Sequence, residues 1–292
     1  FLSISGGNLG RSVANAHTTF KIIEVLFMFP CTPLVVALTE KIIPGEDQKV
    51  HHNELQYITE ISLKSPATMI PQAKNELKRM ADMAQENLDR SIKGFLNQSD
   101  EYLNKIYHRE EDINNVSHAI TDYLVKSNQL SLPLADQKIL GSMFYVVNDI
   151  ERIGDHAENF ADYTKTELKH NTGLTGDAKE EIKKMYEAVS KLLKLSLESF
   201  MAQDGVNTQE DKLAEIAALE ASIDKMERRY QKHHIKRLAK GDCEPRAGLL
   251  FSDMLSELER IADHSVNIAY SMSDEDEDEM LAAENEALAT NN

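Results

Sequence analysis

Residues 149–162 read "DIERIGDHAENFAD", and residues 257–270 read "ELERIADHSVNIAY". The two stretches begin 108 positions apart and agree at seven of their fourteen positions. The recurring residues are Glu151, Arg152, Ile153, Asp155, His156, Asn159 and Ala161, which return as Glu259, Arg260, Ile261, Asp263, His264, Asn267 and Ala269. Agreement of this extent is typical of an internal repeat, so we expect one structural unit to occur twice.

The likeness between the two halves extends upstream of both motifs. Residues 79–95 share an apolar pattern with residues 184–200, and residues 110–120 align with residues 220–230. The alignment places Met80 and Phe95 on Met185 and Phe200, Glu110 on Glu220, and Asn114 on Asp224. The offsets between the copies differ only by loop length, which indicates a tandem pair of similar units.

Six long helical patterns run through the body of the chain, and residues that stop or start helices separate them. The expected helices end near residues 98, 128, 170, 202 and 240, and the last one opens at Glu244-Pro245. We expect Pro66 and Pro71 to precede the first helix, Asp177 to cap the fourth, and Gly241 to end the fifth. No stretch shows the sustained alternation of a strand, so the predicted fold class is all-α, a tandem pair of three-helix bundles.

An apolar stretch at residues 20–43 precedes the helical body, and its length suits the hydrocarbon core of a bilayer. Lys21 flanks it, and Pro30 and Pro33 lie in its middle, where neighbouring helices would have to compensate for them. We expect one transmembrane helix here; a buried core helix is the alternative. Because the first residue is Phe rather than Met, we also expect the chain to be a fragment of a longer protein.

The expected organisation follows from these patterns. It comprises a segment with the one transmembrane helix in 1–45, a linker in 46–75, the first three-helix repeat in 76–170, the second repeat in 171–272, and an acidic disordered tail in 273–292.

Charge and cysteine content exclude several classes of function. A formal net charge of -17 argues against a general nucleic-acid binder, because a polyanion attracts an excess of Lys and Arg. The two cysteines, Cys31 and Cys243, lie far apart and match no metal-ligand or redox spacing, so we interpret them as isolated reduced thiols. Cationic partners, including metal ions, suit this composition better.

The repeated motif places carboxylates on one helix face. At 100° per residue, Glu151 and Asp155 share that face with Asn159 and Asp162, and the second copy repeats the arrangement. The opposite face carries Val146, Ile150, Ile153, Ala157 and Phe160. Carboxylates four positions apart repel each other when no cation lies between them, so such a face favours hard metal ions. A solvated surface face is the alternative for either copy alone.

The tandem layout with "ERIGD" and "ERIAD" on the third helix of each half resembles the PhoU family of phosphate-uptake regulators over about residues 76–272. The resemblance implies multinuclear metal clusters on the repeated carboxylates, with iron or zinc as the associated metals. The implied ligands are Glu151, Asp155, Glu259 and Asp263, with Glu110 and Glu220 as further candidates. His156, His264, Asn159 and Asn267 are expected to support the site rather than to bind the ion. Oxygen-rich ligation also suits magnesium or manganese, so the identity of the metal stays open.

The apolar stretch and the following "SPATMIPQAKNELKRMA" resemble the last membrane segment and junction of bacterial sodium/phosphate cotransporters that carry a PhoU-like domain. This second resemblance implies a transmembrane transport domain upstream of Phe1, with phosphate and sodium as its substrates. It also implies a non-enzymatic regulatory domain on the cytoplasmic side of the inner membrane. Association with a second copy in a homo-oligomer is a further expected contact.

Residues 228–241 form a basic run in an acidic chain. Its simplest interpretation is a helix end whose cations favour the dipole and whose last residue is a capping glycine. The alternative is contact with an anion or a lipid surface through Arg228, Arg229, Lys236 and Arg237. For the chain as a whole, two competing hypotheses remain, a di-metal carboxylate enzyme in a helical bundle and a scaffold that binds no metal.

Overall fold

The computed structural model describes residues 15, 17–24, 26, 55–59, 66–170, 174–202 and 206–271. The chain divides into two compact units, Phe1–His51 and His52–Asn292. Of the apolar stretch 20–43 only residues 20–24 and 26 are described, and the acidic tail 273–292 lies outside the described residues. Among the helices of the described ranges, none combines the length and the apolar character needed to cross a bilayer.

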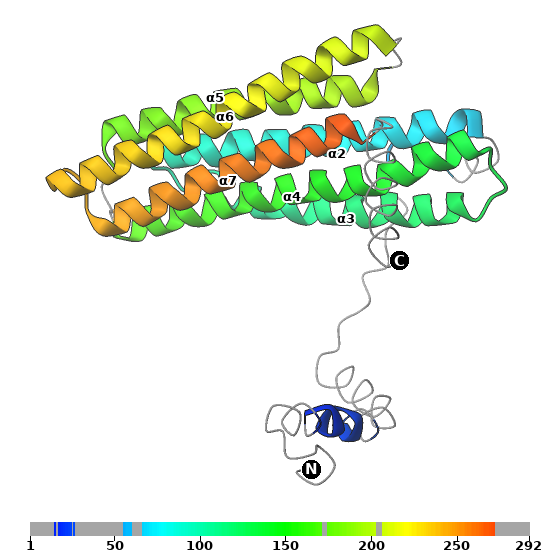
Figure 1. The fold of residues 1–292 in the computed structure, drawn as a ribbon, viewed down its shortest axis with the longest axis horizontal. Helices are drawn as coiled ribbons and strands as arrows, with labels where there is room; N and C mark the ends of the chain where they lie inside the picture. The colour runs from blue at the N-terminus through cyan, green and yellow to red at the C-terminus, as the bar shows by residue number, and fades with distance from the viewer. Residues whose placement is uncertain are drawn as a thin grey trace, which may run out of the picture. The chain divides into compact units, whose positions relative to one another are not determined.

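The described part of the second unit consists of helices and their connections, as the sequence predicts. Its helices are α2 (Pro66–Leu96), α3 (Leu103–Asn128), α4 (Leu134–His170), α5 (Gly176–Met201), α6 (Val206–Lys240) and α7 (Pro245–Tyr270), with labels as in Figure 1. No strand occurs in these ranges. The all-α fold class is therefore confirmed, and each expected helix occurs, ending within a few residues of its expected position.

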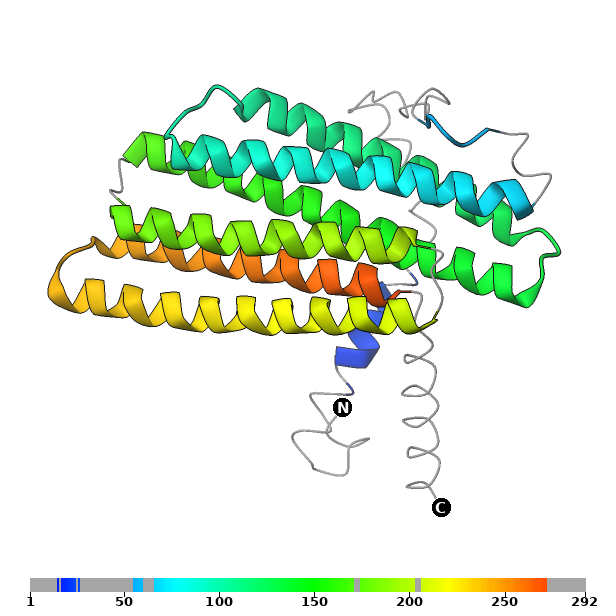
Figure 2. The same cartoon turned by 90° about the horizontal axis from the view of Figure 1, so that it is seen from above.

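The six helices form two bundles of three that lie side by side (Figures 1 and 2). α2, α3 and α4 contact one another in the first bundle, and α5, α6 and α7 do so in the second. The bundles meet where α4 contacts α7 and where α2 contacts α5. The order α3, α4, α7, α6 therefore makes one layer, and α2 and α5 make the other. The repeated motifs lie on α4 and α7, in the middle of the four-helix layer.

The helix termini follow local chemistry, with two corrections to the sequence prediction. Thr175, rather than Asp177, caps α5, because its hydroxyl accepts a hydrogen bond from the amide of Ala178 at 3.3 Å. Pro66 is the first residue of α2 and Pro71 lies inside it, so neither proline precedes the helix. A proline so near a helix start forfeits one early hydrogen bond, and the remaining turns outweigh that loss. Gly241 ends α6 as expected, with φ +75.

The core confirms which faces of the repeated helices point inward. Val146, Ile150, Ile153, Ala157 and Phe160 are all at most 1% exposed. The recurring positions of the upstream helices, Met80 and Phe95 with Met185 and Phe200, are buried as well. Burial of matching apolar positions in both bundles leaves the opposite faces of α4 and α7 to their carboxylates.

Polar contacts also join the bundles on the α2 and α5 side. The ammonium of Lys74 is buried, donates to the carbonyl oxygen of Phe200 at 3.0 Å, and lies 5.1 Å from the centre of the Phe200 ring. Because Phe200 is in the last turn of α5, this hydrogen bond satisfies a carbonyl that has no partner within its own helix. Gln85 adds a hydrogen bond to the hydroxyl of Ser190 at 3.3 Å.

Candidate functional site

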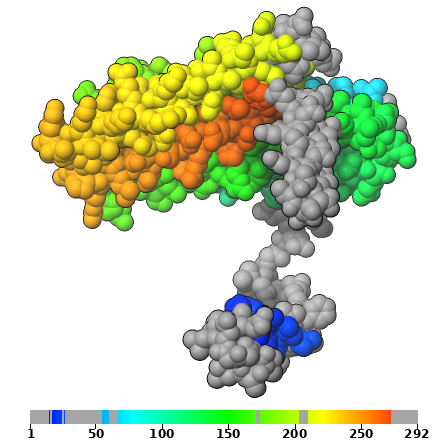
Figure 3. Space-filling model, in the orientation of Figure 1, coloured from blue at the N-terminus to red at the C-terminus, as the bar shows by residue number. Residues whose placement is uncertain are grey.

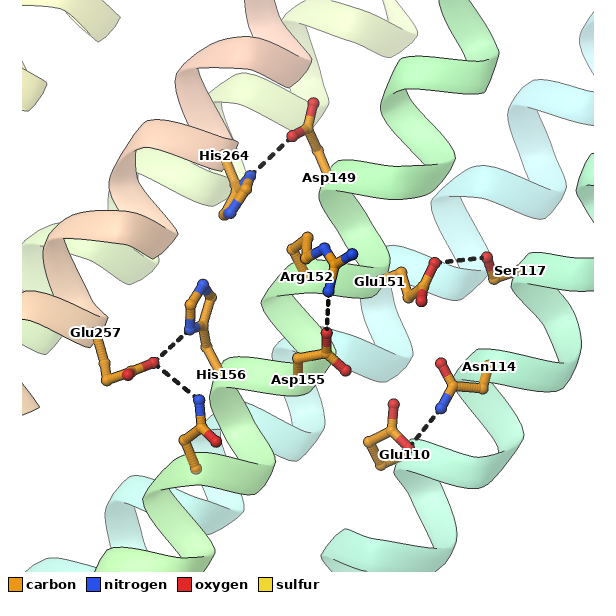
Figure 4. Close-up of polar contacts among 11 residues, drawn as sticks. Glu110, Asn114, Ser117, Asp149, Glu151, Arg152, Asp155, His156, Glu257 and His264 are labelled. Carbon is orange, nitrogen blue, oxygen red and sulfur yellow. Dashed lines mark hydrogen bonds and ion pairs between the residues drawn. The ribbon is translucent and has the colours of Figure 1, made fainter. Parts of the chain in front are cut away.

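The first carboxylate cluster consists of Glu110 from α3 with Glu151, Asp155 and Glu158 from α4. Figure 4 shows three of these side chains facing the space between the two helices. Ser117 donates to Glu151 at 3.2 Å, and Asn114 donates to Glu110 at 2.8 Å. Asp155 pairs with its neighbour Arg152 at 3.0 Å. The three first-half carboxylates that the sequence named therefore lie on the facing sides of α3 and α4, each with a different partner.

Glu110 is the most constrained acid of the first cluster. The residue is 5% exposed, and its Oε1 atom is buried without a hydrogen-bond partner. Burial, followed by the charges of Asp155, Glu158 and Glu151, raises the pKa of Glu110 to about 7, although the hydrogen bond from Asn114 opposes the shift. Near neutral pH this carboxyl is therefore divided between its two protonation states.

The second carboxylate cluster consists of Glu220, Asp224 and Glu227 from α6 with Glu259 and Asp263 from α7. Burial raises the pKa of Glu220, and the charges of Asp224 and Asp263 raise it further. The same two causes, burial first and neighbouring carboxylates second, raise the pKa values of Glu227, Glu259 and Asp263. These shifts indicate that negative charges crowd one another between α6 and α7.

Sequence reasoning did not name Glu158 or Glu227 as site residues. Glu158 follows Asp155 by three positions, which places it on the same helix face, so the helical period alone could have identified it. Glu227 aligns with Ser117 of the first half, where the sequence offers no carboxylate to match. It lies seven positions after Glu220, two turns along α6, and that spacing is the only local signal for it.

The histidines and asparagines of the motif join the two halves. His156 Nδ1 contacts the carboxylate of Glu257 on α7, and Asn159 donates to the same carboxylate at 3.1 Å (Figure 4). In the opposite direction, His264 Nδ1 lies 2.8 Å from Asp149 on α4. We call these contacts the crossed histidine pairs. The rings of His156 and His264 lie 5.6 Å apart, centre to centre.

The crossed histidine pairs explain why the motif recurs beyond its carboxylates. Asp149 and Glu257 occupy the same position in the two copies, so each copy supplies a histidine and accepts one from the other. Burial would raise the pKa of Glu257, but the hydrogen bonds from His156 and Asn159 outweigh burial and lower it. Asn159, expected on the carboxylate face, instead directs its amide toward α7.

Comparison with known proteins agrees with this architecture. The PhoU domain family matches residues 77–164 and 182–272, which include both bundles and both clusters. The chain belongs to the PhoU domain family. The two matched ranges correspond to the two repeats, so each PhoU repeat carries one motif.

Individual PhoU relatives are distant in sequence. The chain is 20% identical over 196 residues to "Phosphate-specific transport system accessory protein PhoU homolog 1" of Thermotoga maritima, covering 67% of this chain and 82% of that protein. It is 23% identical over 199 residues to a protein of Clostridium acetobutylicum named "Phosphate-specific transport system accessory protein PhoU homolog", covering 68% and 87%.

Solved PhoU structures share the fold. The crystal structure of PhoU from Pseudomonas aeruginosa superposes with a TM-score of 0.63 at 19% identity, covering 71% of this chain and 96% of that chain. The phosphate transport system regulatory protein PhoU from Streptococcus pneumoniae gives a TM-score of 0.62 at 20% identity, covering 72% and 97%. Nearly the full length of both proteins is therefore reproduced here.

The basic run of this PhoU chain does not form one patch. Arg228 pairs with Asp224 at 2.7 Å, beside the second carboxylate cluster. Arg237 pairs with Glu181 of α5 at 2.8 Å and lies 5.1 Å from the centre of the Phe251 ring. Arg229 and Lys236 are exposed. The four residues that the sequence grouped therefore divide into two that are engaged within the fold and two that face solvent.

Proposed function

We propose that this chain is a regulatory module of phosphate uptake that acts through metal ions bound at the two carboxylate clusters, and not as an enzyme. Membership of the PhoU domain family supports the regulatory part, because both named relatives are accessory proteins of phosphate-specific transport systems. The observation that carries the metal part is the pair of matched clusters, one between α3 and α4 and one between α6 and α7.

The donor chemistry of the clusters fits a hard cation. All candidate ligands are carboxylates: Glu110, Glu151 and Asp155 in the first cluster, and Glu220, Glu259 and Asp263 in the second. The unpartnered Oε1 of Glu110 is a buried acceptor that a cation would satisfy. Oxygen ligands suit magnesium, manganese or iron, and zinc less well.

The side chains are not arranged as a closed coordination shell. Across the described ranges, no three His, Cys, Asp or Glu side chains converge closely enough to hold a metal ion. The reason is visible in Figure 4, where Glu151 turns toward Ser117 and Asp155 turns toward Arg152. Binding therefore requires these exposed or half-exposed carboxylates to change rotamer and release their present partners. The metal would then supply the positive charge that relieves their mutual repulsion.

The crossed histidine pairs offer a route by which metal at one cluster could influence the other half. Asp155 is next to His156, and Asp263 is next to His264, so a shift of either carboxylate helix also moves a histidine that holds the opposite bundle. Metal would bias the module between two arrangements only to the extent that it binds one of them more tightly.

A further part of the proposal is the identity of the longer protein that contains this module. We propose that this module belongs to a sodium-dependent phosphate cotransporter, on the cytoplasmic side of the bacterial inner membrane, with residues 20–43 as the last membrane segment. Its partner would be the transport domain encoded upstream of Phe1, whose substrates are phosphate and sodium. A stop codon followed by an unrelated start directly upstream of Phe1 would remove this parentage and leave the regulatory proposal standing.

The metal proposal is tested on the purified full chain after chelation and reloading. We expect manganese or iron binding, measured by calorimetry and elemental analysis, to fall sharply in the double variant Asp155→Asn with Asp263→Asn. The matched control is Asp122→Asn with Glu198→Gln, which removes the same charge from exposed positions outside the clusters. Equal metal content in all three proteins would refute the metal part.

The regulatory proposal has a separate cellular test. Cells that carry the Asp155→Asn, Asp263→Asn variant in place of the native gene should take up radiolabelled phosphate without the normal repression by high external phosphate. Normal repression in the variant, together with lost metal binding in vitro, would separate metal binding from regulation.

A further inference from the structure

A stripe of positive charge runs along the outer face of α6. Lys225, Arg229, Lys232, Lys236 and Lys240 follow one another at spacings of three or four residues, which places them on one side of the helix. All five are exposed. We call these residues the basic stripe. The other sides of α6 contact α5 and α7, and Figure 3 shows α6 along one side of the helical unit.

The basic stripe has no counter-charge of its own. Within residues 66–170, 174–202 and 206–271, its five side chains make no hydrogen bond and no ion pair. The two arginines of α6 that do pair, Arg228 and Arg237, lie off the stripe. Five exposed cations on one helix face of a chain with net charge -17 form a surface that fits a polyanion.

A pocket beside the stripe is a weaker anion site than the stripe itself. The pocket has a volume of about 430 Å³, opens between the start of α5 and the end of α6, and includes Lys236 and Lys240. Its remaining lining residues are Asp177, Glu180, Glu181, Lys184, His233, Arg237 and Asp242. Because its carboxylates balance its cations, the pocket has no net preference for an anion.

The chain contains a matching anionic segment a few residues beyond the end of α7. Residues 274–279 read "DEDEDE", an uninterrupted run of six carboxylates that begins four positions after the last residue of α7. The hydroxyl of Tyr270 donates to the carbonyl oxygen of Leu213 at 3.4 Å, which holds the end of α7 beside the N-terminal part of α6. The acidic run is therefore tethered to the helix that carries the basic stripe.

The tether is long enough for the acidic run to reach the first residues of the basic stripe. From Leu213, Lys225 lies about 18 Å along the axis of α6 and Lys232 about 29 Å, at 1.5 Å per residue. An extended chain spans roughly 3.3 Å per residue, so positions 274–279 reach about 13 to 30 Å from Tyr270. This reach includes Lys225 and Arg229 even after the chain crosses the width of α6, about 10 Å.

We propose that the acidic run 274–279 docks on the N-terminal part of the basic stripe, at Lys225 and Arg229. One exposed ion pair contributes less than about 1 kcal/mol. Several pairs along one tethered segment act together, because the tether gives the acidic run an effective concentration on the order of millimolar. This docking goes beyond the regulatory function proposed above and does not depend on a metal ion.

Zero-length cross-linking of the full chain tests the contact. A carbodiimide joins a carboxylate to an amine only where the two touch, and mass spectrometry locates the joined peptides. We expect cross-links from 274–279 to Lys225 at low salt, and their loss at about 0.5 M salt, where charges on the surface are screened. Mixing isotope-labelled and unlabelled chains shows whether each cross-link lies within one molecule.

Two variants and a control make the result specific. Changing all six acids of 274–279 to amides should abolish these cross-links. The triple reversal Lys225→Glu, Arg229→Glu, Lys232→Glu should do the same, whereas reversal of the exposed lysines Lys105, Lys126 and Lys165 in the first bundle should not. Cross-links of 274–279 spread evenly over all lysines, or found only between separate molecules, would overturn the proposal.

An anionic lipid surface is the competing occupant, and flotation with vesicles of phosphatidylcholine and phosphatidylglycerol separates it from the tail. If the tail covers the stripe, the variant with amides at 274–279 binds these vesicles more than the native chain, and the triple reversal removes the gain. Vesicle binding that depends on the stripe but is identical with and without the tail charges would assign the stripe to lipid and refute docking of the tail.

Discussion

The two carboxylate clusters occupy equivalent places in the two bundles and yet differ in charge. The second bundle has Asp224 where the first has Asn114, and Glu227 where the first has Ser117. The first cluster instead adds Glu158, whose counterpart in the second bundle is Val266. Repetition thus preserves the position of the site, while substitutions around it set how much negative charge each copy holds.

The two bundles also differ at one small residue of the motif. Gly154 in "ERIGD" faces Ile113 of α3, and a Cβ atom built on this glycine would lie 3.3 Å from the Ile113 Cγ2 atom. The second copy has Ala262 at the same place. Glu110, on the helix that Gly154 faces, is 5% exposed, whereas Glu220 is only partly buried.

The largest expected effect comes from the crossed histidine pairs. Glu257→Ala leaves buried His156 and Asn159 without their acceptor, and we expect it to lower the free energy of unfolding by about 3 kcal/mol. Asp149→Ala should cost less, because the His264 side chain is 23% exposed and the His156 side chain 9%. Chemical denaturation measures both, with exposed Glu198→Ala as the control. Equal and small losses would show that the pairs do not join the bundles.

The next largest effect is on the pH dependence of stability in the metal-free protein, which should differ between the two clusters. The pKa of Glu110 is raised from 4.5 to about 7, so burial favours its protonated form in the folded state. The stability that this provides is present below about pH 4.5 and is lost as pH rises through 7, with a total of about 3 kcal/mol.

The substitution Glu110→Gln should remove this decrease in stability at high pH, because glutamine does not ionise. We expect the variant to be more stable than the native chain at pH 8 and similar to it at pH 4.5, as measured by denaturant midpoints in the presence of a chelator. Glu111→Gln, whose side chain is 74% exposed in the native chain, is the matched control. The same substitution at Glu220 should act in the same direction with a smaller effect. Parallel pH profiles for Glu110→Gln and Glu111→Gln would contradict the assignment.

A third comparison concerns cation affinity. Because Asp224 and Glu227 add charge to the second cluster, we expect it to bind a divalent ion about tenfold more tightly than the first, a difference of about 1.4 kcal/mol. Asp263→Asn should therefore remove the tighter phase of a calorimetric titration, and Asp155→Asn the weaker one. The opposite assignment of phases would mean that burial of Glu110 matters more than the number of carboxylates.

The smallest expected effect tests the packing around the matching positions 154 and 262. Ala262→Gly should lower the free energy of unfolding by about 1 kcal/mol, because glycine in a helix interior costs that much relative to alanine. Gly154→Ala should gain much less than that amount, since contact with Ile113 offsets the better helix propensity. Thermal and denaturant melts of the two variants measure the difference. A full gain of about 1 kcal/mol for Gly154→Ala would show that Ile113 of α3 moves aside for the added Cβ atom at little cost.

The helices and the faces of α4 and α7 could be predicted from the sequence because both depend on local spacing. A period of 3.6 residues separates Glu151 and Asp155 from the apolar side, and Gly241 and Pro245 mark a helix end and a helix start. The capping role of Thr175 was missed because Asp177, two positions later, is an equally suitable residue type.

The partners of the histidines could not be predicted from spacing, because they lie about a hundred positions away. The signal was nevertheless present, since Asp149 and Glu257 are the first residues of the two repeated stretches. Both are acidic, and neither lies on the carboxylate face of its own helix. An acid that recurs off that face indicates a second contact, here one between the halves.

The crossed histidine pairs limit how the molecule can be divided. A polypeptide that ended after α4 would retain His156 and Asp149 but would lack Glu257 and His264, the groups that each of them contacts. Two copies of such a half-length polypeptide, facing each other with α4 antiparallel to α4, could supply the missing groups to one another. The first bundle expressed alone should therefore sediment as a homodimer, and the native chain contains within one polypeptide what that dimer would assemble from two.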